Sequence, residues 1–478
     1  MNIDFDDNRP LYLQIYEHYR DQIMKGLYSS GMKLPPIRKL ADDLGVSRNT
    51  IETAYGQLTQ EGFVASKQGS GYTVENLTTI DAIYAQEHNE ESSRSAFMKR
   101  NRYTPYAIQP KKQLTYDFTY GDLEEGSFPA DAWRKLTSEV LFGVETKSLS
   151  TYNDNQGDFW LRLFIANQLQ VTQGIPCFPE QVVIQPGTQA SVQTVLSLFD
   201  PSHDIAVFED PGYDGVRVVF ENCGFKVVPL PILSSDKHTH PKVLEQNKPK
   251  LIFITPSNQF PTGTILPIKV RQYMLDWATK NDAYIIEDDY CREFRYKGKS
   301  APSLYSLDQH RRVIYLGTFS KALSPALRIS YLVLPPRLLN RWRVRYKDYY
   351  SQVPWLSQAV LRRFEEEGLW DKLVRKAQTR NRKKYEKLMV TLKKYMGNKI
   401  NIMESGAGLH LLVGVCDNRD QQTLIDQAAA ANVRVYETRK YWINTDPKYK
   451  NYVLIGFSAI NEQDIEPGIK ALAKAWFE

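Results

Sequence analysis

The feature that most constrains the fold is a regular alternation of short apolar runs with helical segments, from about residue 114 toward the C-terminus. The apolar runs have the length and composition of strands, and they read "QVVIQPG", "DIAVFEDPG", "KVVPLPI", "KLIFITPS", "AYIIEDDY", "RRVIYLGT" and "ISYLVLP". Strands that recur with helices between them are typical of βαβ units, in which the strands lie parallel. The sequence therefore predicts an α/β domain with a largely parallel sheet.

Residues 1–75 predict a separate small domain of three helices and a β-hairpin. The first helix is expected from Pro10, with an inward face that repeats Leu11, Ile15, Tyr19 and Ile23. The segment "PPIRKLADDLG" predicts a second helix that ends at a glycine, and "SRNTIETAYGQLTQEG" predicts a third that begins after a serine cap. The segment "FVASKQGSGYTV" alternates around two glycines, as a short hairpin does.

The second and third of these helices form a helix-turn-helix pattern, which is typical of DNA-binding domains. Hydroxyl, guanidinium and amide groups follow the turn at Gly45, at the start of a helix that would meet base edges and phosphates. The glycines of "KQGSG" would let the hairpin approach the DNA backbone as a wing. The residues expected at the DNA are Ser47, which also caps the helix, Arg48, Asn49, Thr50, Lys67 and Gly69. A helix pair used only for packing against protein is the alternative.

The chain is expected to hold more than one domain, because 478 residues exceed one ordinary core. Residues 76–113 are polar, weakly periodic and interrupted by prolines, which indicates a linker between domains at 1–75 and 114–478. No run of eighteen apolar residues and no leader-like start occurs, so we expect a soluble, cytoplasmic protein without membrane contact. The four cysteines form no C-x-x-C pair, which favours reduced thiols over a disulfide or a metal site.

The net charge of +6, from 61 basic and 55 acidic residues, is too small to indicate nucleic acid by itself. Residues 1–75 carry 8 basic against 10 acidic side chains, so charge alone would not identify the DNA-binding segment. The strongest basic run is residues 371–395, with 10 basic and 2 acidic side chains. Its apolar residues recur at helical spacing, which predicts an amphipathic helix with a solvated face. A secondary contact with the DNA backbone is the alternative.

Two segments of the α/β region carry groups suited to a phosphorylated aldehyde. In "YLGTFSKALSPALRIS", Lys321 lies among small residues and hydroxyls, where an amine can lose its proton and form an imine. Thr318 and Ser320 beside it, with Arg328 one to two helical turns later, would bind a phosphate ester. In "QPGTQASVQTV", a glycine, Thr188 and Gln189 join a strand to a helix, whose first N–H groups can receive phosphate.

Two further segments suit the ring of such a compound. The run "EDDY" closes a strand, and there Asp288 can keep a pyridine nitrogen protonated while Tyr290 hydrogen-bonds a ring oxygen. Tyr213, in "EDPGYDGV", can stack on a flat ring. Taken alone, the acidic run is also typical of a solvated strand end or of a divalent-metal site, although we expect no metal.

These segments together resemble known families over nearly the whole chain. The stretch "LPPIRKLADDLGVSRNTIETAYGQLTQEGFVASKQGSGYTV" resembles the winged helix-turn-helix head of GntR-family regulators, which implies that Arg38 also contacts the DNA backbone. Residues 114–478 resemble fold-type I pyridoxal-phosphate enzymes of the aspartate aminotransferase kind, through "TPSNQFPTGT", "IEDDY" and "GTFSKALSPALRISY". The combination resembles MocR-type regulators, a group that includes GABA-responsive and pyridoxal-phosphate-responsive activators.

The resemblance implies an α+β winged helix-turn-helix head joined to an α/β aminotransferase-like body, with pyridoxal 5'-phosphate as cofactor. It also implies a homodimer on a double-stranded DNA operator. Lys321 would be the Schiff-base lysine, Asp288 the partner of the pyridine nitrogen and Tyr290 the contact of the phenolic oxygen. Tyr213 would stack on the ring. The phosphate ligands implied are Thr188, Gln189, Thr318, Ser320 and Arg328.

The sequence departs from the aminotransferase pattern at positions that bind substrate. Phe260 takes the place of an Asn that would hydrogen-bond the cofactor, and Leu454 takes the place of the Arg that clamps the substrate carboxylate. Arg439 can offer a carboxylate contact from another direction, a role that an arginine in this region has in GABA-type regulators. Those regulators bear a second arginine where this chain has Gly215, which leaves Arg217 as a substitute.

The departures favour a sensor over a working enzyme, because an apolar side chain cannot supply a charge-assisted bidentate bond. The preferred interpretation is a regulator that senses pyridoxal phosphate and controls genes for vitamin B6 synthesis, with at most a weak transaminase half-reaction. The alternatives are a regulator that responds to an amino acid such as GABA through its imine with the cofactor, an active aminotransferase with a DNA-binding head, and a structural nucleoid-type binder.

Overall fold

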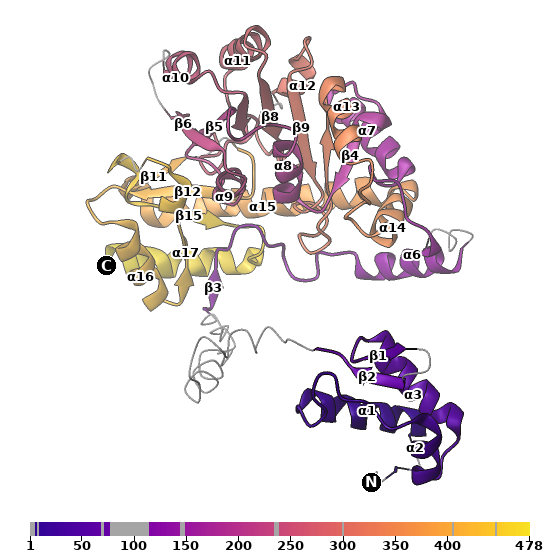
Figure 1. Cartoon of the computed structure of the whole chain (residues 1–478). Helices are drawn as coiled ribbons and strands as arrows, with labels where there is room; N and C mark the ends of the chain where they lie inside the picture. Colours follow the sequence, from indigo (N-terminus) through magenta and orange to yellow (C-terminus); the bar gives the residue numbers. More distant parts are fainter. Residues whose placement is uncertain are drawn as a thin grey trace. The chain divides into compact units, whose positions relative to one another are not determined.

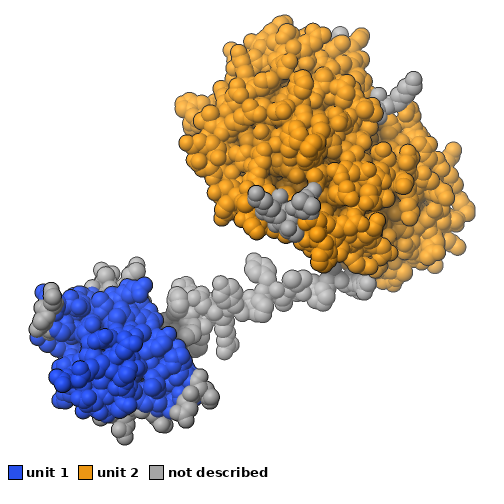
Figure 2. Space-filling model, turned by 90° about the vertical axis from the view of Figure 1, so that its right-hand side faces the viewer, with its two compact units in different colours: residues 1–111 blue, residues 112–478 orange. Residues whose placement is uncertain are grey.

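The computed structural model describes residues 5–6, 9–67, 71–76, 114–143, 149–233, 239–298, 301–403, 406–444 and 447–478. It separates into two compact units, residues 1–111 and residues 112–478 (Figure 2). The predicted linker at residues 76–113 lies outside the described residues from residue 77 onward, so its bounds stay a prediction. No helix in the described part of the chain is both long and apolar enough to cross a membrane.

The N-terminal unit holds the predicted helices and hairpin around a core of its own (Figure 1). Its elements are α1 (Leu11–Met24), α2 (Ile37–Leu44), α3 (Arg48–Gln60) and the antiparallel strands β1 (Val64–Lys67) and β2 (Gly71–Val74). Ile15, Tyr19 and Ile23 of α1 are buried as predicted. The prediction was wrong for Leu11, which is 40% exposed because it lies in the first turn of α1, one turn before the buried Ile15.

The C-terminal unit is built on a seven-stranded sheet in the order β4-β10-β9-β8-β7-β5-β6 (Figure 1). Six strands run in one direction and β10 runs against both its neighbours, so the sheet is largely parallel, as predicted. The strands are β4 (Val182–Gln185), β5 (Ile205–Asp210), β6 (Lys226–Pro231), β7 (Leu251–Ile254), β8 (Tyr284–Asp288), β9 (Val313–Thr318) and β10 (Ser330–Val333).

Helices cover both faces of this sheet. Successive residues of a strand point to opposite sides, and here the residues on both sides are apolar, so each face packs against helices. Phe208 packs in one core cluster with residues of α8, α9 and α13, whereas its neighbour Val207 packs in another with residues of α10, α11 and α12. These helices are α8 (Thr188–Leu196), α9 (Asp214–Asn222), α10 (Thr239–Asn247), α11 (Ile268–Lys280), α12 (Leu304–Leu307) and α13 (Pro336–Arg345). With both faces covered, the polar end of the sheet is left for a site.

A second, four-stranded sheet lies toward the C-terminus, in the order β11-β12-β15-β14. Its strands are β11 (Ile400–Met403), β12 (His410–Val415), β14 (Tyr436–Glu437) and β15 (Tyr452–Gly456). A separate parallel pair joins β3 (Tyr116–Asp117) to β13 (Val433–Arg434), so the start of this unit is tied to its C-terminal part. The helices of the remainder are α6 (Ala130–Phe142), α7 (Phe159–Gln173), α14 (Trp355–Glu366), α15 (Leu369–Met396), α16 (Gln421–Ala430) and α17 (Glu462–Phe477).

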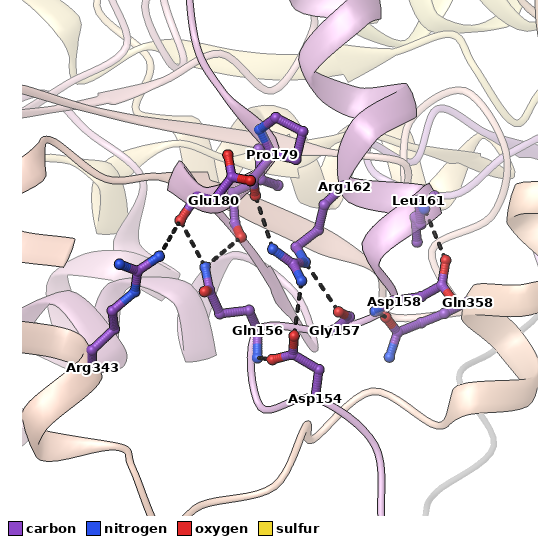
Figure 3. Close-up of polar contacts among 11 residues, drawn as sticks. Asp154, Gln156, Gly157, Asp158, Leu161, Arg162, Pro179, Glu180, Arg343 and Gln358 are labelled. Carbon is purple, nitrogen blue, oxygen red and sulfur yellow. Dashed lines mark hydrogen bonds and ion pairs between the residues drawn. The ribbon is translucent and has the colours of Figure 1, made fainter. Parts of the chain in front are cut away.

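A buried arginine ties the loop before α7 to the segment before β4 (Figure 3). Arg162 donates to the Gly157 carbonyl oxygen at 3.0 Å, to the Pro179 carbonyl oxygen at 3.0 Å and to Asp154 Oδ2 at 2.9 Å. The Gln156 side chain donates to the Glu180 carbonyl oxygen at 2.9 Å. The buried guanidinium therefore has hydrogen-bond acceptors for its N–H groups. We assign this network the structural role of holding α7 against the segment that leads into β4.

Candidate functional site

A cavity of about 420 Å³ opens at the carboxyl ends of β7, β8 and β9. This is the edge at which parallel α/β sheets present ligands. All nine residues predicted to bind a cofactor line the cavity: Thr188, Gln189, Tyr213, Asp288, Tyr290, Thr318, Ser320, Lys321 and Arg328. The structure thus brings together residues spread over 141 positions of the chain (188 to 328, inclusive). Their binding role stays a prediction.

Lys321 follows β9 and presents its amine to the cavity. Its Nζ lies 4.3 Å from the centre of the Tyr120 ring, and no hydrogen bond to Nζ occurs within the described residues. Burial lowers the pKa of Lys321, and the nearby Cys291 and Asp288 oppose this effect only in part. The amine can therefore lose its proton more readily than a lysine in water, as a nucleophilic amine must.

Asp288 ends β8 and is 4% exposed. Its Oδ1 is buried and has no hydrogen-bond partner among the residues that the structure describes. Burial, with a smaller contribution from the neighbouring Asp289 carboxyl, raises the pKa of Asp288 to about 8. An unpaired buried carboxyl is costly unless something else satisfies it, so this atom is suited to a ligand group that carries or accepts a proton.

Another part of the cavity combines a helix start with a guanidinium. Gly187 precedes α8 with φ 100° and ψ 165°, a conformation almost restricted to glycine, and its N–H donates to Ser330 Oγ at 3.0 Å. A Cβ at this glycine would collide with the guanidinium of Arg328, which itself has a left-handed φ of 53°. Thr318 Oγ1 accepts from the Ser320 N–H at 3.1 Å. N–H groups at a helix start beside an arginine form a site for phosphate.

Aromatic rings form one wall of the cavity. Phe260 lies 5.3 Å from Tyr120, 5.5 Å from Tyr213 and 4.8 Å from Tyr441, measured between ring centres. The Tyr290 hydroxyl donates to the Asn258 carbonyl oxygen at 2.9 Å and accepts from its Nδ2 at 2.8 Å. Phe260 thus packs against three tyrosines in this wall, and its replacement of an amide that would hydrogen-bond the cofactor stays a prediction.

Neither arginine predicted to contact a substrate carboxylate lines the cavity. Leu454 is fully buried in β15, and Arg439 and Arg217 are not among the lining residues. Lys440, next to Arg439, does line the cavity, with its Nζ 3.4 Å from Asp214 Oδ2. Lys440 and Asp214 were not among the residues predicted from the sequence. The segment "TRKYW" does contain a second basic residue beside Arg439, but the local sequence does not indicate which of the two adjacent basic side chains faces the cavity.

The N-terminal unit exposes the residues predicted to meet DNA. Ser47 caps α3, since its Oγ accepts from the Thr50 N–H at 3.1 Å. Arg48 and Asn49 follow at the exposed start of this helix, where Thr50 is half-buried. Arg38 on α2 and Lys67 at the end of β1 are also exposed, and Gly69 lies outside the described residues. The start of α3 is therefore accessible to a groove, and its contacts with DNA stay a prediction.

Family comparisons cover nearly the whole chain. The gntR family of bacterial regulatory proteins matches residues 11–74, and the aminotransferase class I and II family matches residues 116–472. The chain is similar to the uncharacterized HTH-type transcriptional regulator YdeL of Bacillus subtilis, with 35% identity over 98% of this chain and 97% of that protein. It is also similar to the probable rhizopine catabolism regulatory protein MocR of Rhizobium meliloti, with 31% identity over 99% of this chain and 95% of that protein.

A further relative is the HTH-type pyridoxine biosynthesis transcriptional regulator PdxR of Corynebacterium glutamicum, with 27% identity over 95% of this chain and 93% of that protein. Among solved structures, the α-aminoadipate aminotransferase LysN of Thermus thermophilus superimposes with a TM-score of 0.67 at 24% identity, over 76% of this chain and 92% of that chain. This likeness shows the fold of the body. The chain belongs to the aminotransferase class I and II family and, with its gntR-family head, is a transcriptional regulator of the MocR type.

Proposed function

We propose that this regulator binds pyridoxal 5'-phosphate in the cavity and that the bound cofactor controls operator binding by the head. One observation carries the proposal. A single cavity holds a lysine amine with a lowered pKa, a buried carboxyl oxygen without a partner, and a guanidinium packed over a glycine at a helix start. These three groups match the aldehyde, the ring nitrogen and the phosphate of the cofactor.

Each residue of the cavity would contact a different part of the cofactor. Pyridoxal phosphate supplies an aldehyde open to attack by an amine, on a pyridine ring that withdraws electrons. Lys321 would attach to it, and Asp288, with its pKa raised to about 8, would share its proton with the ring nitrogen. Tyr290 would hydrogen-bond the ring oxygen and Tyr213 would stack on the ring. The phosphate would lie against Thr188, Gln189, Thr318, Ser320 and Arg328.

The signal in this proposal is pyridoxal phosphate itself, and the regulated genes are those of vitamin B6 synthesis. All nine residues predicted to bind the cofactor line the cavity, whereas the resemblance to aminotransferases puts the buried Leu454 in the place of the arginine that clamps a substrate carboxylate. The similarity to a regulator named for pyridoxine biosynthesis agrees with this choice. Because a ligand shifts an equilibrium only by binding one state more tightly, the cofactor must favour one arrangement of head and body.

An amino-acid effector is the second candidate, and Lys440 is the observation that favours it. Lys440 lines the cavity, and its Nζ lies 3.4 Å from Asp214 Oδ2. This ion pair is longer than a strong charge-assisted hydrogen bond, so the carboxylate of an effector could replace Asp214 as the partner of Lys440. An effector such as GABA, with an amine for the cofactor and a distal carboxylate for Lys440, would fit this arrangement. Steady-state turnover with several amino donors and 2-oxoglutarate would distinguish either sensor from an active aminotransferase.

The working form in this proposal is a homodimer that places two heads on one operator. Large apolar side chains are exposed on the body, where Phe142 is 88% and Tyr152 is 80% exposed, and Tyr152 stacks on the exposed Tyr350 with ring centres 4.0 Å apart. Large apolar side chains left exposed in this way support a partner copy. The proposed domains are residues 1–75 and 114–478, joined by residues 76–113.

The experiment that tests the proposal titrates apo-protein with pyridoxal phosphate while operator binding and footprint are recorded. The expected result is a change in affinity or footprint that Lys321→Ala abolishes, although this variant still binds the operator. A footprint and an affinity that stay the same from apo-protein to saturated protein, while an amino acid alters them, would favour the second candidate. No response to any of these ligands would refute a sensor.

A further inference from the structure

Helix α15 (Leu369–Met396) is labelled in Figure 1. It carries a pattern of charged residues that do not line the cavity. Between residues 372 and 384 it has seven Lys or Arg residues and no Asp or Glu. Two of the seven face inward and share one carboxylate: Arg380 Nε and Lys384 Nζ lie 3.1 Å and 3.0 Å from Glu124 Oε2. The other five are exposed and form no ion pair within the described part of the chain. We call them the basic stripe: Lys372, Arg375, Lys376, Arg382 and Lys383.

The basic stripe follows one face of the helix. Its members are 3, 4, 10 and 11 residues beyond the first, so at 100° per residue they lie within an arc of about 120° and span about 16 Å along the axis. The opposite face is buried in the body through Ala377, Tyr385 and Leu388. The stripe is therefore held rigidly, with its cations directed to solvent.

The stripe differs from cations on α14 and at the end of α15, which are paired with carboxylates. Arg363 on α14 lies 2.9 Å from Glu366, and Lys394 at the end of α15 lies 2.8 Å from Glu466. In the stripe, by contrast, Lys372 and Lys376 are one turn apart and repel each other. Rows of like charge on a helix are disfavoured unless an anion compensates them. Glu386 lies one turn beyond Arg382 and Lys383 on the same helix, but among the described side chains it forms no ion pair with either of them.

We propose that the basic stripe binds the phosphate backbone of the DNA that the head binds. DNA is the polyanion that the gntR-family head is expected to bind. The head itself has few basic side chains with which to neutralise phosphates. Residues 1–75 carry 8 basic and 10 acidic side chains, although phosphate neutralisation supplies much of the affinity of a DNA-binding protein. The stripe has charge but no aromatic or amide groups, so its contact is independent of DNA sequence. The inference rests on operator binding by the head, not on the choice of effector.

The test compares two full-length variants with the same change in net charge. The first replaces the five stripe residues with Gln. The second replaces five exposed lysines elsewhere on the body that also form no ion pair within the described residues: Lys226, Lys242, Lys269, Lys280 and Lys470. Operator affinity is measured from 50 to 200 mM salt, with circular dichroism and cofactor absorbance as checks of folding. A milder variant, Lys372→Gln with Lys376→Gln, protects the test against loss of folding.

The expected result is a weaker dependence of operator affinity on salt in the stripe variant alone. Each phosphate contact contributes about 0.9 to the slope of log affinity against log salt, so two lost contacts lower the slope by about 1.8. The wild type should then lose about 12-fold more affinity than the stripe variant between 50 and 200 mM salt. Backbone protection outside the bases read by the head should also disappear. Equal slopes for the two variants would overturn the proposal, and so would a stripe variant with the wild-type slope and footprint. Arg48→Ala, which acts through the head, would weaken binding in either case.

Discussion

The substitution Gly187→Ala tests the phosphate end of the cavity in a single position. The added methyl group would collide with the Arg328 guanidinium, so the arginine must move away from the start of α8. The loss of one charge-assisted bond from arginine to phosphate costs about 1.5–3 kcal/mol, which corresponds to about 10- to 150-fold weaker binding of pyridoxal phosphate. The backbone at φ 100° and ψ 165° adds a stability cost of about 1–3 kcal/mol.

Two measurements separate these effects. Titration of apo-protein with pyridoxal phosphate, followed by visible absorbance, gives the affinity, and urea denaturation of the same samples gives the stability. Gly174→Ala is the matched control, because Gly174 also has a positive φ, of 63°, but no atom lies within 4 Å of the position of its Cβ. We expect this control to lose about 1–2 kcal/mol of stability and to keep its affinity for the cofactor. Wild-type affinity in Gly187→Ala, or equal losses in both variants, would refute the assignment of Arg328 to the phosphate.

Three further predictions concern Lys321, Asp288 and Arg48. Lys321→Ala should abolish the visible absorbance of the bound cofactor and the effector response but keep operator binding, and a normal response in this variant would show that attachment to the lysine is not the switch. In apo-protein, the Asp288 pKa of about 8 exceeds its unfolded value of about 3.9, so the folded state holds a proton that the unfolded state has lost between these pH values. The stability of apo-protein should therefore fall as pH rises through this window and Asp288→Asn should fall less, as denaturation at pH 5 and pH 8 would measure; parallel curves would contradict the raised pKa. Arg48→Ala should weaken specific operator binding by about 1–3 kcal/mol if the guanidinium reads a base, whereas a uniform loss over all DNA sequences in a binding assay would identify a phosphate contact.

Much of the fold follows from local pattern. The apolar runs gave seven strands of the large sheet because strands covered on both faces are nearly continuous in hydrophobic residues. The antiparallel direction of β10 could not be predicted, because a short apolar run has the same composition whether it runs with or against its neighbours. The first turn of α1 shows a similar limit, because helical spacing places Leu11 on the inward face but does not say where the core of the head ends.

The candidate site was predictable where short motifs at strand ends carry it. Asp288 ends β8 and Lys321 lies three residues after β9, whereas Arg328 lies two residues before β10. Because β10 runs against its neighbours, its start lies at the same edge of the sheet as their carboxyl ends. Tyr120 and Lys440 were not predictable, because each comes from a distant part of the chain and no local pattern directs it to the cavity. The single-residue difference between Arg439 and Lys440 has a physical reason: residues Arg439–Tyr441 form a short 3-10 turn, in which adjacent side chains point in different directions.

The most direct test of a cofactor-controlled regulator is the thermodynamic link between the cavity and the head. The operator dissociation constant is measured with and without saturating pyridoxal phosphate, and the dissociation constant of pyridoxal phosphate is measured with and without saturating operator. Linkage requires the two ratios to be equal, and cofactor control of the head predicts that both are clearly different from 1 in the wild type. A ratio of 1 in both measurements would mean that the cavity and the head act independently, and it would contradict cofactor control.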